Sequence, residues 1–339
     1  MTNDIIPVIL WCVPRSVSTA TERAFMGKEG CRCWHEPLGD PFYFSSKRQS
    51  LRYSEEECKA SGNWDKDIVD VMQTLLDPEA NNVGTDKKGP VKYVFVKDMA
   101  QYIIPRQTLE KIHKGQGSQC YRTDGETCGT SRCTGVDSEG EIIENPTVIP
   151  TALMRRFKHT FLVRTPTKAV PSYYKCCQDK MAGFEFFDGA EAGFEELRIL
   201  YKWISNPRST FNTDKEDGPG AVSFPGKAQK QPLPPPLIDA SVLLANPAST
   251  IKHICDQTGI PFDPAMLSWD AKPQAEFAKW GAYHQGAENS TGFKCEDDGA
   301  AKTNGEEAKI AKLPQEVRNT IERNMEPYEW LVKRQTTFA

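Results

Sequence analysis

The sequence predicts a three-layer α/β domain in which helices flank a central parallel sheet. Three short apolar runs support this fold class, at residues 7–13, 91–99 and 159–166. Nearly continuous apolar runs of this length are typical of parallel strands that are buried on both faces. Each run is followed by a segment that reads as helix, and strands alternating with helices indicate a parallel sheet. We expect one domain over residues 1–339, without internal repeats.

The first strand, PVILWCV at residues 7–13, leads through a short loop into a helix that is expected to start at Ser18. The apolar positions that follow have helical spacing: Ala20, Ala24 and Phe25. Thr19 and Glu22 match the T-x-x-E pattern of a capping box. The order strand, tight loop and helix start therefore opens the chain.

The loop between this strand and helix is rich in hydrogen-bond donors, namely Arg15, Ser16, Ser18 and Thr19. The helix start adds unpaired N–H groups and the positive end of the helix dipole, so the loop is suited to a phosphate-like anion. The loop lacks the glycine and lysine of the pattern G-x-x-x-x-G-K-[ST], which disfavours an ordinary ATPase. The alternative is a capped helix start with an incidental arginine.

The second strand, residues 91–99, is bounded by Gly89 and Pro90, and the third strand, residues 159–166, carries Arg164 near its end. Ser172 lies eight positions after Arg164. Ligands of open α/β sheets bind beyond the carboxyl ends of the strands, so Arg164 would approach the first loop if the first and third strands are neighbours. Two cationic anchors could then grip two phosphate groups. The alternative is that Arg164 pairs with a surface carboxylate and Ser172 is exposed.

Helices are expected after the second and third strands and later in the chain, at 107–114, 168–178, 191–204 and 246–259. In the last of these, Asn246 is the expected N-cap, Pro247 the first helical residue and Gly259 the residue just past the end. Irregular insertions are expected at about 114–150 and 206–236, where Gly, Pro, Ser and charged residues replace any periodic pattern.

Charge and composition exclude several classes of function. A net charge of −4 argues against bulk binding of nucleic acid or of an anionic membrane. No apolar run approaches the roughly 20 residues of a membrane span, and no basic start followed by an apolar core indicates a secretory signal. Eleven cysteines without a C-x-x-C pair are interpreted as reduced thiols, and no metal site is expected. These features predict a cytoplasmic protein.

Both anion motifs resemble those of the sulfotransferase family, which uses 3′-phosphoadenosine 5′-phosphosulfate (PAPS). VPRSVSTATERAF is similar to the family's 5′-phosphosulfate loop, P-[KR]-[ST]-G-[ST]-T, and FLVRTPTKAVPSYY is similar to its 3′-phosphate element. HEPLGDPFY, VKDMAQYI and GIPFDPAMLSW resemble a small-molecule branch found among fungi, plants and bacteria. The resemblance covers most of the chain outside the two insertions and implies a three-layer P-loop-type fold.

The resemblance also implies the residues that bind the donor. The loop Pro14, Arg15, Ser16, Val17, Ser18 and Thr19 would bind the 5′-phosphosulfate, whereas Arg164 and Ser172 would bind the 3′-phosphate. Val17 departs from the family pattern, because many members have glycine there for close approach to an anion. No clear copy of the family's late R-K-G element is present; STGFK at residues 290–294 is the candidate replacement, with a simple loop as the alternative.

Sulfuryl transfer needs alignment and stabilisation of charge on the leaving oxygen, for which Arg15 and the helix start are suited, and a base for the acceptor proton. The candidate bases are Glu22, His35, Glu36 and Asp98. Glu22 could instead complete the capping box, His35 could be structural, and Asp98 could cap the next helix. Aromatic residues proposed for an acceptor pocket, with ordinary core packing as the alternative, are Trp11, Trp34, Phe42, Tyr43 and Tyr102.

The function predicted from the sequence is transfer of a sulfuryl group from PAPS to a hydroxyl or amine of a small molecule, leaving adenosine 3′,5′-bisphosphate (PAP). Three alternatives remain open: a nucleotide-dependent kinase, a relative that only binds a nucleotide, and a sulfotransferase fold reassigned to another reaction. The missing lysine of the nucleotide-binding loop disfavours the kinase.

Overall fold

The computed structural model describes residues 5–82, 90–121, 140–179, 184–213, 224, 226–294 and 303–337. Its centre is a parallel five-stranded sheet with the order β2-β3-β1-β4-β5. The strands are β1 (Ile6–Cys12), β2 (Cys31–His35), β3 (Tyr93–Met99), β4 (Lys158–Val163) and β5 (Leu237–Asp239). The predicted α/β class with a central parallel sheet is confirmed, as are the three strands that the apolar runs indicate.

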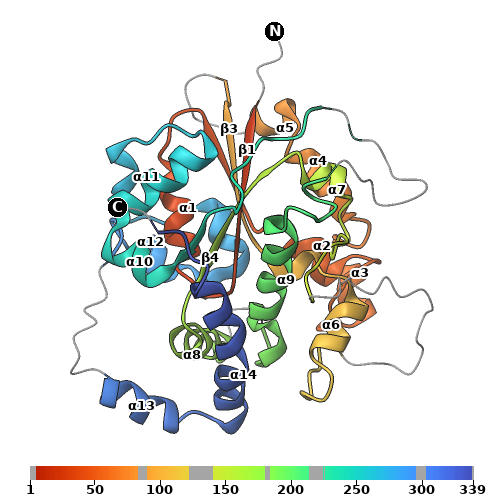
Figure 1. Ribbon diagram of the computed structural model, residues 1–339. Coiled ribbons are helices and arrows are strands. Elements are labelled where there is room, and N and C mark those ends of the chain that lie inside the picture. Colours follow the sequence, from red (N-terminus) through yellow and green to blue (C-terminus); the bar gives the residue numbers. More distant parts are fainter. Residues whose placement is uncertain are drawn as a thin grey trace.

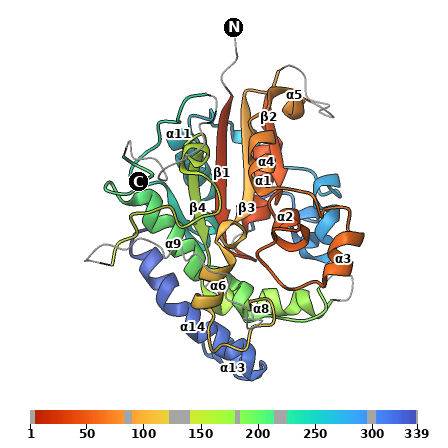
Figure 2. The ribbon, with the colours of Figure 1, turned by 90° about the vertical axis from the view of Figure 1, so that its right-hand side faces the viewer.

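Helices cover both faces of the sheet. Figure 1 shows the sheet nearly edge-on, with α1, α10 and α11 on one side and α2 and α9 on the other, and Figure 2 shows the strands from the side of α9. The α-helices up to the third strand are α1 (Ser18–Met26), α2 (Gly39–Phe44), α3 (Glu55–Ala60), α4 (Ile68–Thr74) and α5 (Pro78–Asn82). The 3₁₀ segments are η1 (Ala100–Ile103), η3 (Gly189–Ala192), η4 (Pro264–Leu267) and η5 (Ala275–Tyr283). The remaining α-helices are α6 (Arg106–Ile112), α7 (Thr151–Met154), α8 (Pro166–Cys177), α9 (Phe194–Ser205), α10 (Ala240–Ala245), α11 (Pro247–Thr258), α12 (Gln285–Glu288), α13 (Thr303–Ala311) and α14 (Gln315–Val332).

Strand β1 lies between β3 and β4, and this position decides where a ligand can bind. Cys12 at the end of β1 is paired with Met99 of β3 and with Leu162 of β4, so three strands end together. The connections from β1 and β3 run toward opposite edges of the sheet, which opens a crevice beyond the carboxyl ends of these strands. The loop after β1 and Arg164 after β4 are therefore neighbours, as predicted.

Two strands escaped the sequence analysis because their patterns are weak. Strand β2, sequence CRCWH, pairs with β3 from Cys31 to His35 as an edge strand. Its buried cysteines alternate with a partly exposed Arg32 and Trp34, so it lacks a continuous apolar run. Strand β5 has three residues, too few for a periodic signal.

The predicted helices are confirmed, including the details of α11. Asn246 is its N-cap, Pro247 its first residue, and Gly259 adopts the left-handed conformation at its end, with φ of 80°. Within the predicted insertions, residues 122–139, 214–223 and 225 lie outside the described residues, and the described parts that precede β4 and β5 contain no long helix.

Burial and cysteine chemistry agree with the sequence analysis. None of the described cysteines forms a disulfide, and all of them except Cys176 are buried. None of the helices in the described ranges combines the length and the apolar character that crossing a membrane requires.

Candidate active site

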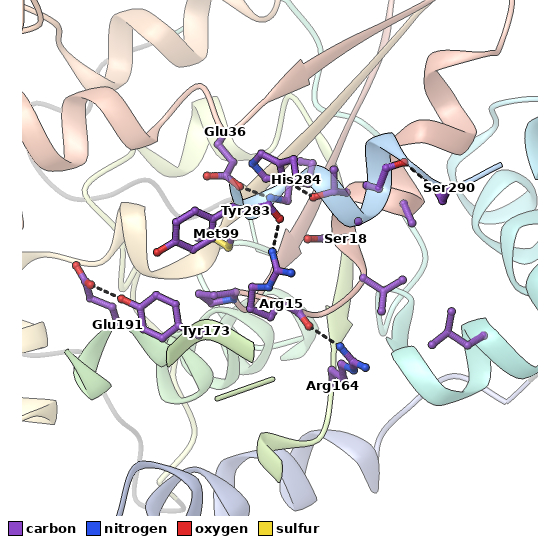
Figure 3. Close-up of a pocket in the computed structure, with 18 of the residues that line it drawn as sticks. Arg15, Ser18, Glu36, Met99, Arg164, Tyr173, Glu191, Tyr283, His284 and Ser290 are labelled. Atoms are coloured by element: carbon purple, nitrogen blue, oxygen red, sulfur yellow. Dashed lines mark hydrogen bonds and ion pairs between the residues drawn. The ribbon is translucent and has the colours of Figure 1, made fainter. Parts of the chain in front are cut away.

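A cavity of about 370 Å³ lies beyond the carboxyl ends of β1, β3 and β4 (Figure 3). One part of its wall is the loop after β1 and the first turn of α1, and another is the segment from Tyr283 to Lys294. The third part comes from residues that follow β2, β3 and β4. The cavity thus occupies the crevice that the strand order creates.

The loop after β1 is held in a conformation that L-amino acids rarely adopt. Arg15 has φ of 65° and Val17 has φ of 70°, both in the left-handed region. Val17 is the N-cap of α1, so the first N–H groups of this helix lack carbonyl partners within the helix. Ser18, Thr19 and Ala20 of that first turn line the cavity, which gives it a positive helix end.

Val17 adopts a backbone conformation that glycine would adopt without strain. A left-handed conformation costs a non-glycine residue about 1–2 kcal/mol, and more for a β-branched side chain. Residues held in such conformations cluster at ligand sites. The third non-glycine residue with positive φ among the described residues is Glu36, with φ of 46°, and it lines the same cavity.

Replacing Val17 by glycine should leave the free energy of unfolding within about 1 kcal/mol of that of the unchanged protein, because relief of backbone strain offsets the lost packing and the added chain flexibility. Val13→Gly is the control: Val13 is fully buried beside the same loop and has no positive φ, so its loss should cost about 2 kcal/mol or more. Urea denaturation of both variants measures the difference. Equal destabilisation would contradict the assignment of strain to Val17.

Arg15 and Arg164 meet, as the strand order requires. Arg164 Nη1 donates to the main-chain oxygen of Arg15 at 3.1 Å, and both side chains line the cavity. Arg15 Nε donates to Ser172 Oγ at 3.0 Å, and its Nη1 donates to the main-chain oxygen of Tyr283. Ser172 therefore contacts Arg15 and does not line the cavity wall.

Two further residues of the predicted loop differ in their placement. Pro14 lines the cavity together with Arg15, Val17, Ser18 and Thr19. Ser16 is fully buried and donates through Oγ to the main-chain oxygen of Val13 at 2.8 Å, so its hydroxyl points away from the cavity. The loop thus offers Ser18 and Thr19 as hydroxyl donors, and Ser16 stabilises the turn.

The capping box predicted for Thr19 and Glu22 is wrong. The N-cap is Val17, without a side-chain cap, and the carboxylate of Glu22 lies inside the protein. Glu22 Oε2 lies 2.6 Å from His35 Nδ1, and His35 Nε2 lies 3.0 Å from His284 Nε2. Burial of Glu22 turns its carboxylate toward a ring nitrogen instead of the helix start. Two of the candidate bases, Glu22 and His35, therefore lie together behind the cavity wall.

His284 is the functional candidate that the sequence analysis missed. Its side chain lines the cavity, and its Nδ1 lies 3.2 Å from Thr19 Oγ1. The residue follows the 3₁₀ segment η5, where no motif stood out. A cue was available in GAYHQG, an isolated histidine beside small residues, but that pattern alone does not indicate proximity to His35.

Glu36 follows β2 and forms an ion pair with Lys97 at the end of β3. Burial on its own raises the pKa of Glu36, but the charges of Lys97 and His35 outweigh it and lower the pKa to about 2. Burial lowers the pKa of Lys97, and Glu36 more than reverses this and raises it. Both groups line the cavity as a charged pair.

Asp98 is buried and does not line the cavity. Its Oδ2 accepts from the N–H of Leu38 and its Oδ1 accepts from the N–H of Met99, both at 2.9 Å. Burial raises the pKa of Asp98 to about 8, despite these two hydrogen bonds. The side chain of Asp98 therefore joins the loop after β2 to the end of β3. It forms a hydrogen bond with none of the other candidate bases, Glu22, His35 and Glu36.

Among the described residues, one set has the spacing of metal ligands: His35, Glu36 and His284 each offer an atom within 4.8 Å of the others. The same atoms are already engaged, because the two Nε2 atoms contact each other and the ammonium group of Lys97 contacts Glu36. A cation between them would also face Lys97 at close range, which disfavours metal binding.

The end of the cavity away from the anion loop is aromatic. Tyr43, Tyr102, Tyr173 and Phe184 line it together with Met99. Tyr43 and Tyr102 are thus placed as predicted, whereas Trp11 donates to His159 Nδ1 in the core, Trp34 donates to Asn81, and Phe42 packs in the core. Of the five predicted aromatic residues, two therefore line the cavity and three pack elsewhere.

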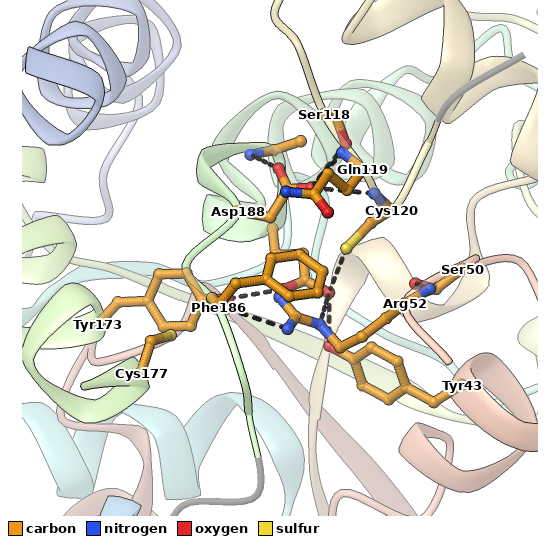
Figure 4. Close-up of polar contacts among 12 residues, drawn as sticks. Tyr43, Ser50, Arg52, Ser118, Gln119, Cys120, Tyr173, Cys177, Phe186 and Asp188 are labelled. Carbon is orange, nitrogen blue, oxygen red and sulfur yellow. Dashed lines mark hydrogen bonds and ion pairs between the residues drawn. The ribbon is translucent and has the colours of Figure 1, made fainter. Parts of the chain in front are cut away.

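A buried carboxylate, Glu191, orients this aromatic wall, and its partners Tyr43, Arg52 and Tyr173 are labelled in Figure 4. Tyr43 donates to Glu191 Oε1 at 3.2 Å and Tyr173 donates to Oε2 at 2.6 Å. Arg52 donates to both oxygens of Glu191 and also to the main-chain oxygen of Phe186. Burial, followed by the charge of Glu191, raises the pKa of both tyrosines well above their ordinary value, so their hydroxyls stay donors.

Known proteins share parts of this sequence. Residues 226–316 match the sulfotransferase domain family, and this stretch includes Tyr283, His284 and residues 290–294. Ser290, Gly292, Phe293 and Lys294 line the cavity, so the candidate replacement for the late nucleotide-binding element lies at the site. The family match does not extend to the loop after β1 or to Arg164.

The chain is 28% identical over 146 residues to the branched-chain-amino-acid aminotransferase-like proteins 1 and 2 of Arabidopsis thaliana, which is 43% of this chain and 20% of each relative. It is 29% identical over 137 residues to sulfotransferase ppzF of Metarhizium majus (strain ARSEF 297), which is 40% of this chain and 37% of that protein. The chain thus matches only about a fifth to two fifths of the length of these relatives.

A solved structure, a sulfotransferase domain from the curacin biosynthetic pathway, is similar over 96% of this chain and 98% of that chain, with a TM-score of 0.39 and 13% identity. The domain-family match and the fungal sulfotransferase agree with the two motifs in the sequence, so parts of this chain are similar to sulfotransferases.

Proposed function

We propose that this protein moves a sulfuryl group from PAPS to a hydroxyl or amine of a small molecule and releases PAP. The observation that carries the proposal is the meeting of two arginines in one cavity: Arg15 after β1 and Arg164 after β4 lie side by side at the N-terminus of α1. Two cationic groups and a positive helix end suit a donor that carries two separated anionic groups.

The described residues fit such a donor. Arg15, Ser18, Thr19 and the first N–H groups of α1 would hold the 5′-phosphosulfate, and Arg164 would hold the 3′-phosphate. Ser172 would act through Arg15, because its Oγ accepts a hydrogen bond from Arg15 Nε at 3.0 Å. Residues 290–294 would complete the nucleotide end, with Lys294 as a further cation.

The donor supplies an activated sulfuryl group, whose bond to a phosphate oxygen breaks as a bond to the acceptor forms. Charge then develops on the leaving phosphate oxygen, and the guanidinium group of Arg15 and the N-terminus of α1 stabilise it. The acceptor must lose a proton, so a base at the cavity wall completes the reaction. A sulfuryl group with one negative charge does not require a metal ion for neutralisation.

Cavity size and lining support a small-molecule acceptor. The cavity of about 370 Å³ is of the size that small-molecule sites have. Its aromatic end, with Tyr43 and Tyr173 held by Glu191, offers a rigid and largely apolar surface for the acceptor. We further propose a cytoplasmic location and no nucleic-acid or membrane partner, which the net charge of −4 and the free buried thiols support.

PAP should raise the melting temperature of the protein more than ADP at equal concentration, because only PAP offers a 3′-phosphate to Arg164. A thermal-shift titration with PAP, ADP and ATP with Mg²⁺ measures this difference. The control variant Arg164→Gln should reduce the shift with PAP toward the shift with ADP. Equal shifts for PAP and ADP would refute the donor assignment, and a larger shift with ATP and Mg²⁺ would favour a kinase.

A further inference from the structure

A continuous chain of contacts leads from a buried carboxylate to the cavity. Glu22 Oε2 lies 2.6 Å from His35 Nδ1, His35 Nε2 lies 3.0 Å from His284 Nε2, and His284 Nδ1 lies 3.2 Å from Thr19 Oγ1. The side chains of Glu22 and His35 are 0% and 1% exposed, so this part of the series of contacts is shielded from bulk solvent. Of the two histidines, His284 is the one that lines the cavity (Figure 3).

Hydrogen-bond rules fix the direction of this series of contacts when both histidines are neutral. A carboxylate accepts, so His35 donates from Nδ1 to Glu22, and a neutral His35 then accepts at Nε2. His284 must therefore donate from Nε2 to His35, which leaves its Nδ1 with a lone pair. Thr19 fills this lone pair by donating its hydroxyl hydrogen. In this arrangement of donors and acceptors, His284 is a neutral tautomer with an accepting nitrogen toward the cavity.

We propose that His284 Nδ1 is the base that takes the proton of the acceptor, and that His35 and Glu22 are positioning residues that act through it. This proposal rests on the proposed sulfuryl transfer and adds a catalytic residue from the C-terminal part of the chain. In the transfer step, the S–O bond to the donor phosphate breaks and its electron pair stays on the phosphate oxygen. The new bond joins sulfur to the acceptor atom, and the acceptor proton moves to His284 Nδ1.

Thr19 couples this base to the donor. Its hydroxyl donates to His284 in this structure, and the same hydroxyl is a proposed ligand of the donor's anionic group. When Thr19 donates to that anion instead, the lone pair on His284 Nδ1 becomes accessible to the acceptor. The base is therefore freed when the donor site is filled, which would limit unproductive proton transfer.

The groups around His284 keep it neutral before the reaction. It faces His35 from β2, Glu36 after β2, Lys97 from β3 and Arg15 from the anion loop. Burial, followed by the positive charge that His35 can carry, lowers the pKa of His284 to about 2. A proton received by His284 can pass from its Nε2 to His35 and from His35 Nδ1 to Glu22, so the carboxylate compensates for the burial of the rings.

The variants His284→Asn and Glu22→Gln test the proposal, with activity measured as a function of pH. His284→Asn should lower kcat about 10²-fold, because the group that takes the acceptor proton is lost. It should also abolish the fall at acid pH of kcat/KM for the acceptor at saturating donor, where the nearby donor anion raises the pKa of His284. Glu22→Gln should lower kcat about 10-fold or more and move that fall to lower pH, because the histidines lose the stabilising negative charge. Glu22→Asp should recover part of the loss.

The chain offers a matched control in a second buried histidine and carboxylate pair. His113 Nε2 lies 2.6 Å from Glu196 Oε1, the same separation as between His35 and Glu22, and neither residue lines the cavity. Glu196→Gln should lower the melting temperature as Glu22→Gln does, but it should leave the pH profile of kcat/KM unchanged. An effect that comes only from lost stability would appear in both variants.

PAP binding, measured by thermal shift, distinguishes failure of this proposal from failure of the proposed function. If PAP stabilises His284→Asn as it does the unchanged protein, while kcat falls and the acid limb disappears, the proposal is supported. If kcat and the acid limb persist in His284→Asn, or if Glu22→Gln and Glu196→Gln change activity alike, His284 is not the base and the donor assignment stands. If the unchanged protein neither binds PAP nor transfers a sulfuryl group, the proposed function fails and this proposal fails with it. If His284→Asn does not fold, kcat and the pH profile of kcat/KM are measured for Glu22→Gln and His284→Gln instead.

Discussion

Replacing Arg15 by alanine should lower kcat by about two to three orders of magnitude. If the guanidinium group faces the leaving phosphate oxygen, its interaction strengthens as charge develops there, so its loss affects the transition state more than the ground state. The position of Arg15 at the cavity wall, beside the N-terminus of α1, is consistent with this role. Steady-state kinetics with saturating donor measure the effect.

Arg15 also contacts the segment from Tyr283 to Lys294, so the experiment needs a control for that contact. Arg15 Nη1 donates to the main-chain oxygen of Tyr283. Arg23, on α1, donates to the main-chain oxygen of Ala287 in this segment and to those of Asp270 and Lys272 before it, but it does not line the cavity. Arg23→Ala should therefore weaken docking of the segment and lower the melting temperature, with a much smaller loss of kcat than Arg15→Ala.

Arg164 should behave differently, because its contact with a 3′-phosphate would be the same in the ground state and in the transition state. Arg164→Ala is expected to raise the KM for the donor and to change kcat little, provided that the chemical step limits turnover. Arg164→Gln keeps a donor for the main-chain oxygen of Arg15, which Arg164 contacts at 3.1 Å, and so separates loop distortion from lost charge. An unchanged kcat in Arg15→Ala, with folding and donor binding intact, would reduce the loop to an ordinary helix start.

Local patterns predicted the part of the site that lies next to regular strands and helices. The apolar runs located β1, β3 and β4. The rule that ligands bind beyond the ends of parallel strands predicted that Arg15 and Arg164 lie close together. The departure at Val17 also had structural meaning, because this residue adopts the left-handed conformation that glycine adopts without strain.

Contacts between distant segments were not predictable in this way. His35 and His284 are 249 positions apart, and nothing in the local sequence of either indicates the other. Glu22 shows the limit of a motif: the T-x-x-E pattern is present, but burial directs the carboxylate to His35 rather than to the helix start. Ser16 and Asp98 likewise have the residue types of a binding loop and a base, yet their side chains satisfy main-chain groups inside the protein.

Breaking the ion pair between Arg52 and Glu191 should have the largest effect on stability. Both side chains are almost fully buried, at 2% and 1% exposed. Arg52→Met leaves the carboxylate of Glu191 without its cation in a low-dielectric interior, and such changes cost about 3–5 kcal/mol. The rings of Phe184 and Phe186, which lie within 4.4 Å and 4.2 Å of the guanidinium carbon, would accommodate the apolar side chain but not replace the charge.

A double-mutant cycle measured by urea denaturation tests whether the buried charge causes this cost. Glu191→Gln in the Arg52→Met background removes the unpaired charge, so the double variant should recover part of the free energy of unfolding. Arg198→Met is the control, because Arg198 pairs with Glu195 and Glu326, whose side chains are 28% and 71% exposed, and solvent-screened pairs contribute about 1 kcal/mol or less each. Since Tyr43 and Tyr173 donate to Glu191, the double variant should also bind the acceptor more weakly while its PAP shift is retained. A cost of Arg52→Met no greater than that of Arg198→Met would show that Glu191 does not depend on Arg52, and the rigid aromatic wall would need another explanation.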